Sequence, residues 1–135
     1  MKISDITIDK NYYMTEGCGA FAVILAKMIQ GDVYIISNRY GESWSKSIPY
    51  EVTHVVVVKD GTAYDVTGIT SKDQISKYFN IPVTDLIIKG PYDPNQFSKK
   101  FLGTNDRYPL YPADAQIKKE VTAYISQNEN IFKKA

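Results

Sequence analysis

The sequence predicts a single α+β domain over residues 1–135, in which an antiparallel sheet packs on a buried N-terminal helix headed by Cys18 and a further helix closes the C-terminus. Three observations predict this class. A chain of 135 residues with 44% apolar residues has the size of one ordinary domain. The run Ala20–Ala26 is apolar on every side of a helix, which is typical of a helix inside a domain. Asp60-Gly61 separates two β-branched runs and indicates a tight hairpin.

The charge balance and the cysteine content exclude several classes of protein. With 16 basic and 15 acidic residues the formal net charge is +1, so we expect no nucleic-acid and no membrane partner. One cysteine allows neither an internal disulfide nor a zinc site built from several thiolates. The segment Met1–Lys10 lacks the apolar core of a signal peptide, and no apolar run is long enough to cross a bilayer. We therefore expect a cytoplasmic protein.

The N-terminal elements centre on the apolar run. A short strand is predicted near Ile3–Ile8, and the polar, tyrosine-containing segment Asn11–Gly17 reads as a loop. A buried helix should follow over Cys18–Gln30, with Gly31 ending it.

A strand and a long loop come next. Asp32–Ser37 is β-branched and aromatic, which predicts a strand. Asn38–Glu51 is polar and contains Trp44. Loops of this length in small domains are often functional.

The hairpin has a register that the sequence itself defines. Strands are predicted over Val52–Lys59 and Thr62–Thr67, joined by the two-residue turn Asp60-Gly61. His54 and Asp65 then lie on the same face of the two strands as diagonal neighbours, close enough for an imidazole and a carboxylate to hydrogen-bond.

The C-terminal half is predicted as alternating short elements. Thr70 or Ser71 should cap a helix that runs to about Phe79. The remaining expected elements are a strand over Asp85–Lys89, a short helix within Asp93–Leu102 and a closing helix over Ala113–Phe132. We expect the closing helix to dock on the sheet through one apolar stripe, made of Ile117, Val121, Tyr124, Ile125 and Phe132.

Cys18 is a candidate nucleophile. At the first turn of a helix, unpaired backbone N–H groups and the positive end of the helix dipole stabilise a thiolate. The same N–H groups can stabilise the oxyanion of an acyl intermediate. The alternative is that Cys18 is a small buried hydrophobic residue, as most intracellular cysteines are.

His54 and Asp65 are candidates for the base and the group that orients it. A carboxylate on one imidazole nitrogen fixes the tautomer and leaves the other nitrogen to accept the thiol proton. Each residue alone also has a plainer interpretation: a strand histidine with satisfied hydrogen bonds, and an aspartate that turns the chain at the end of a strand.

These segments resemble a known superfamily. Gly17-Cys18-Gly19-Ala20-Phe21-Ala22 opening a helix, then His54-Val55-Val56-Val57, then Tyr64-Asp65-Val66-Thr67-Gly68 resemble the Cys, His, Asp order of the papain-like superfamily, with the transglutaminase-like and arylamine N-acetyltransferase branches most similar. Small uncharacterised phage and bacterial proteins built on this core are similar too. The resemblance covers about half of the chain and leaves the C-terminal half unexplained.

The resemblance implies a papain-like domain and a cysteine hydrolase that cleaves an amide, isopeptide or thioester acyl group of a peptide, protein or small molecule. Acyl or amine transfer through the same acyl-enzyme is an alternative. Another is a non-catalytic protein, such as a phage-type inhibitor of a host protein, that uses its tyrosine-rich loops as a contact surface. We expect substrate contacts from Tyr13, Gly17, Gly19 and Trp44.

No cofactor or metal is expected. The chain has no phosphate-binding glycine loop, and its one histidine and one cysteine stand far apart in the sequence. We interpret the basic pairs Lys99-Lys100 and Lys118-Lys119 as solvated helix faces.

Overall fold

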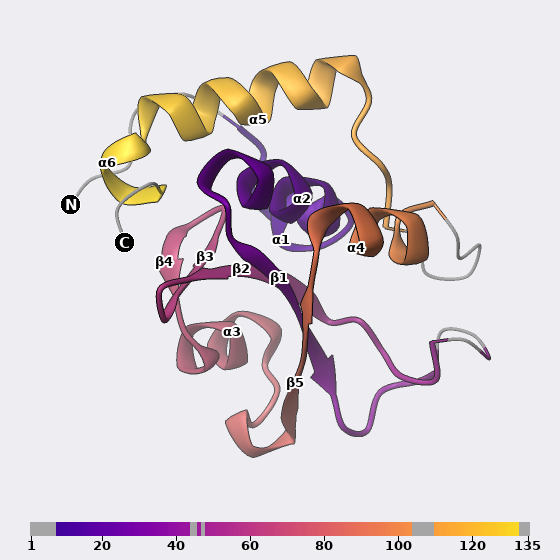
Figure 1. The fold of residues 1–135 in the computed structure, drawn as a ribbon. Helices are drawn as coiled ribbons and strands as arrows, with labels where there is room; N and C mark the ends of the chain where they lie inside the picture. Colours follow the sequence, from indigo (N-terminus) through magenta and orange to yellow (C-terminus); the bar gives the residue numbers. More distant parts are fainter. Residues whose placement is uncertain (1–7, 44–45, 47, 104–109, 133–135) are drawn as a thin grey trace.

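The computed structural model describes residues 8–43, 46, 48–103 and 110–132, and over these it is a mixed α/β fold (Figure 1). Its sheet has the strand order β4-β3-β2-β1-β5, and every neighbouring pair is antiparallel. The strands are β1 (Asp32–Asn38), β2 (His54–Lys59), β3 (Thr62–Asp65), β4 (Gly68–Thr70) and β5 (Leu86–Tyr92). The predicted antiparallel sheet is confirmed, whereas the predicted strand Thr62–Thr67 ends at Asp65, and a turn then leads into β4.

The central helix is α2 (Cys18–Ile29), and the prediction of a buried helix that begins at Cys18 is confirmed. It packs against β1, β2 and β3 on one side and against other helices on its outer side. Because it is covered from both directions, its apolar residues need not form a single stripe. Its end differs from the expectation: Gln30 itself adopts the left-handed conformation, with φ 59°, and Gly31 follows outside the helix.

The turn between β2 and β3 has the predicted geometry. Lys59 pairs with Thr62 and Val57 with Tyr64, so the loop contains only Asp60 and Gly61. Both loop residues have positive φ, 50° and 79°, as a type I′ turn requires. The predicted register of the hairpin is therefore confirmed.

The segment predicted as an N-terminal loop contains a helix. α1 (Lys10–Met14) is capped by Asp9, whose carboxylate accepts the Tyr12 N–H at 3.0 Å. The Asp9 cap was missed because tyrosines and asparagine dominate the five residues that follow it. The strand expected over Ile3–Ile8 falls, apart from Ile8, outside the described residues.

The C-terminal half begins much as predicted. α3 (Lys72–Phe79) has Ser71 as its N-cap, and α4 (Pro94–Phe101) begins with Pro94 behind the cap Asp93. A single 3₁₀ turn, η1 (Val83–Asp85), precedes β5.

The closing helix differs from the expectation in two ways. It is split into α5 (Ala115–Gln127) and α6 (Glu129–Phe132), with a break at Asn128. It also does not dock on the sheet as one stripe: α5 packs on α2, and α6 packs on β4 (Figure 1). From α5, the Tyr124 hydroxyl donates to the Val66 carbonyl in the turn between β3 and β4. The apolar stripe is real, since Val121, Tyr124 and Phe132 are buried, but α2 provides most of the surface that it covers.

The sheet separates two apolar clusters. The larger one lies between the sheet and α2 and includes Val33, Ile35, Val55 and Val57. The smaller one lies on the opposite face, where Ile75 of α3 packs on the sheet. Strand alternation assigns His54, the first residue of β2, to the face that α3 covers.

Candidate functional site

The candidate site lies where β2 begins and β3 ends. His54 opens β2 and Asp65 closes β3, while Cys18 is the first residue of α2. Because α2 packs against the other face of the sheet, Cys18 meets His54 at the end of the sheet and not across its face. All three side chains are buried, with exposed fractions of 2% for Cys18, 0% for His54 and 2% for Asp65.

His54 is held by a hydrogen bond at each ring nitrogen. Nε2 lies 3.0 Å from Asp65 Oδ2, and Nδ1 lies 3.0 Å from the Met14 carbonyl oxygen. A carbonyl only accepts hydrogen bonds, so Nδ1 carries a proton. The ring also packs against Phe79 of α3, with 5.4 Å between ring centroids. The predicted pairing of His54 with Asp65 across the hairpin is thereby confirmed.

The charges of the site favour an imidazolium. Burial by itself lowers the pKa of His54, but the hydrogen bond to Asp65 and the interaction with Cys18 raise that pKa to about 9. Burial by itself raises the pKa of Asp65. Its hydrogen bonds to His54 and Thr67 outweigh burial and hold the pKa of the carboxyl below its usual value. The pair is therefore a buried ion pair at neutral pH.

Asp65 is oriented by its own strand end. Its Oδ1 accepts both the backbone N–H and the hydroxyl of Thr67, which leaves Oδ2 directed at His54. An aspartate carboxylate that accepts hydrogen bonds from the residue two positions later is a common turn motif. The sequence Asp65-Val66-Thr67 is therefore consistent with this contact. Asp65 therefore turns the chain at the end of β3 and also orients His54, so the two sequence interpretations of this residue are compatible.

The start of α2 differs in detail from the expected oxyanion site. Cys18 N–H donates to the Thr15 carbonyl at 3.1 Å, so this N–H group is not free to bind an oxyanion in the structure. Gly17 is the N-cap and provides no side-chain cap. The carbonyls of Met14, the last residue of α1, and of Thr15, which follows it, thus occupy one donor each of His54 and Cys18.

The residues expected to contact substrate make close contacts inside the protein. Tyr13 is 2% exposed, and its hydroxyl donates to Glu120 at 2.6 Å. A Cβ added to Gly17 would lie 2.3 Å from the Tyr12 ring, and one added to Gly19 would lie 2.7 Å from Leu102. Both glycines therefore permit close packing. Their role in substrate binding stays a prediction.

Trp44, the fourth residue expected at the substrate, lies outside the described residues. Among the residues that the structure describes, no cluster of three or more histidine, cysteine, aspartate or glutamate side chains could hold a metal ion. Within the same part of the chain, no helix is both long and apolar enough to cross a membrane.

Sequence reasoning missed the Met14 carbonyl as a partner of His54. A backbone carbonyl has no residue-specific signature, and its position depends on α1, a segment for which the sequence predicts a loop. Comparison of the chain with protein-family models, with curated proteins and with solved structures found no match.

Proposed function

We propose that this chain is a cysteine hydrolase of papain-like type that cleaves an amide, isopeptide or thioester acyl group. Cys18 is the nucleophile, His54 the base and then the acid, and Asp65 the orienting group. One observation carries the proposal: the His54 imidazole bonds to Asp65 and interacts with the thiol at the first residue of a buried helix. A nucleophile, a base and an orienting carboxylate in this order are the working parts of thiol-dependent acyl transfer.

The proposed reaction has two steps. In the open form His54, freed from the Met14 carbonyl, first releases its second proton to solvent. It then takes the Cys18 proton, the thiolate attacks the acyl carbon, and His54 returns the proton to the departing amine or thiol, leaving a thioester on Cys18. Water, deprotonated by His54, then attacks the thioester and releases the acid and the Cys18 thiol. An amine in place of water would give transfer by the same route.

The arrangement in the structure is a closed form in this proposal. Substrate cannot reach a thiol that is 2% exposed, and the Met14 carbonyl occupies His54 Nδ1. Opening requires the connection between α1 and α2 to move away from His54. The same movement would break the bond from Cys18 N–H to Thr15, so that an N–H at the positive end of α2 could face an oxyanion.

Two measurements test the proposal. The rate of Cys18 alkylation by iodoacetamide should persist below about pH 7 in the unmodified protein, and in His54→Asn it should require pH near the ordinary thiol pKa of about 8.5. Incubation with an activated acyl ester should leave an acyl group on Cys18, detected by intact mass, and none on a Cys18→Ser variant. A pH profile that is the same with and without His54, together with no acyl adduct, would refute the proposal.

The burial of all three side chains specifically favours a second candidate function. In a non-catalytic binding protein on this scaffold, the ion pair of His54 and Asp65 would serve only to join β2 and β3 to α1. Such a protein needs no opening of the site. Its Cys18 would alkylate only as fast as the whole chain unfolds, and denaturant would accelerate alkylation in parallel with global unfolding.

A further inference from the structure

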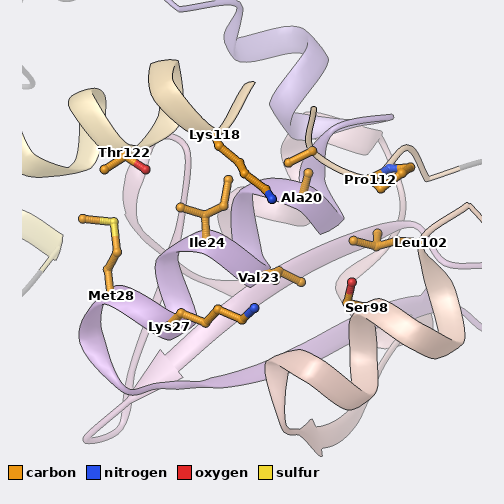
Figure 2. A pocket seen from close by; sticks show the side chains of 11 residues that line it. Ala20, Val23, Ile24, Lys27, Met28, Ser98, Leu102, Pro112, Lys118 and Thr122 are labelled. Atoms are coloured by element: carbon orange, nitrogen blue, oxygen red, sulfur yellow. The ribbon is translucent and has the colours of Figure 1, made fainter. Parts of the chain in front are cut away.

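A cavity of about 430 Å³ lies on the outer side of α2, between α2, α4 and α5 (Figure 2). We call it the outer cavity. Its apolar lining includes Ala20, Val23 and Ile24 of α2 together with Leu102 after α4. None of the three candidate catalytic residues lines it, so it is separate from the site described above.

Two lysines flank this apolar surface. Lys118 reaches from α5 toward α2 near Ala20, and Lys27 lies along α2 beside Val23 (Figure 2). No aspartate or glutamate is among the described residues that line the cavity. Within the described part of the chain neither lysine forms an ion pair. The local charge is therefore positive although the whole chain is nearly neutral.

The size and lining of the cavity are those of a small-molecule site. Pockets for such ligands measure roughly 300–1,000 Å³ and combine an apolar surface with a few polar groups that fix orientation. Here the polar groups are the two ammonium groups and the hydroxyls of Ser98 and Thr122. All four can donate hydrogen bonds, which suits an acceptor such as a carboxylate.

We propose that the outer cavity binds an amphipathic carboxylate of the medium-chain fatty-acid class. The chain lies on the apolar surface of α2, and the carboxylate is held by Lys27 or Lys118 or by both. Lys118 is exposed, as the sequence interpretation of a solvated helix face requires, and in this proposal it also contacts the ligand. Lys119 does not line the cavity and has no such contact.

Titration of the full chain with decanoate, followed by amide chemical shifts, tests the proposal. Saturable shifts should concentrate in α2, α4 and α5. Decanol, which has the same chain without the charge, should bind at least about threefold more weakly, because it lacks the ionic contact. Lys118→Gln and Lys27→Gln should each weaken decanoate binding by about two- to fivefold, and Lys119→Gln should not. Thr122→Trp, an exposed substitution that fills the cavity, should reduce binding further.

Three results would overturn the proposal. One is the absence of saturable binding by decanoate in a protein with unchanged circular dichroism. Another is equal binding of decanoate and decanol, since the lysines would then contribute nothing. The third is equal loss of affinity in Lys118→Gln and Lys119→Gln, which would indicate non-specific attraction to a basic helix.

Discussion

At the scale of single residues, Asp65 holds the His54 imidazole from across the hairpin, with 3.0 Å between Nε2 and Oδ2. A two-residue turn fixes the register, and strand alternation fixes the face. The bond of His54 to the Met14 carbonyl could not be predicted, because it depends on how α1 is placed and not on the identity of residue 14.

Removing the carboxylate of Asp65 should strongly destabilise the protein. Asp65→Asn leaves a buried imidazole that can no longer be paired with a negative charge and also weakens the bonds to Thr67. Breaking one side of a buried ion pair costs about 3–5 kcal/mol. Urea unfolding at pH 7 measures the loss, with the exposed Asp60→Asn as a matched control that should change the free energy of unfolding by less than about 0.5 kcal/mol. A loss below about 1 kcal/mol in Asp65→Asn would show that the ion pair is not formed.

At the scale of elements, the long apolar helix and the capped helices α3 and α4 were predictable, because their residues carry strong signals of periodicity and capping. α1 was not predictable in the same way. Only one turn and a half long, it is stabilised by distant contacts: Tyr13 to Glu120 and Tyr78 to Asn11. Short helices depend on such packing more than on their own sequence.

Weakening α1 should open the site. Asp9→Ala removes the N-cap of α1, a loss worth about 1 kcal/mol, which should raise the open fraction and hence the alkylation rate of Cys18 by about fivefold at constant pH. Asp93→Ala removes the corresponding cap of α4 and serves as the control. The rate is measured by mass spectrometry under conditions where the fold is intact by circular dichroism. Equal rates in Asp9→Ala and Asp93→Ala would contradict the role of α1 as the closing element.

At the scale of the whole molecule, the position of α5 could not be derived from its stripe. A stripe of apolar residues shows that a helix is buried on one side, but it does not say whether a sheet or another helix lies against it. The composition of α2 indicates where α5 packs, because a helix that is apolar on every side must be covered on both sides. The sheet covers one side of α2, and α4 and α5 cover the other.

The buried ion pair should make the stability of the whole molecule depend on pH. The folded protein keeps a proton on His54 up to a pKa of about 9, whereas the unfolded chain loses it near 6.5. The free energy of unfolding should therefore fall as pH rises from 6.5 to 9. On the acid side, the lowered pKa of Asp65 stabilises the fold above pH 3.8, and this contribution should be lost as pH falls below that value.

The alkaline part of this dependence can be isolated by substitution. Urea unfolding at pH 6, 7, 8 and 9 should show a decline in the unmodified protein and a flatter profile in His54→Gln, which carries no titrating ring. Stability that rises up to about pH 6.5 and then stays level to pH 9 would indicate instead that burial keeps His54 neutral.

The central claim is that His54 is a buried imidazolium held by hydrogen bonds to Asp65 and to the Met14 carbonyl. The chain has one histidine, so its imidazole carbon-bound protons give a resonance that can be followed without assignment of the rest of the spectrum. A proton NMR titration should give a His54 pKa of about 9 in the unmodified protein. The pKa should fall in Asp65→Asn, because burial still lowers it and one of the two groups that raise it has been removed. A pKa at or below the ordinary 6.5 in the unmodified protein would contradict the account.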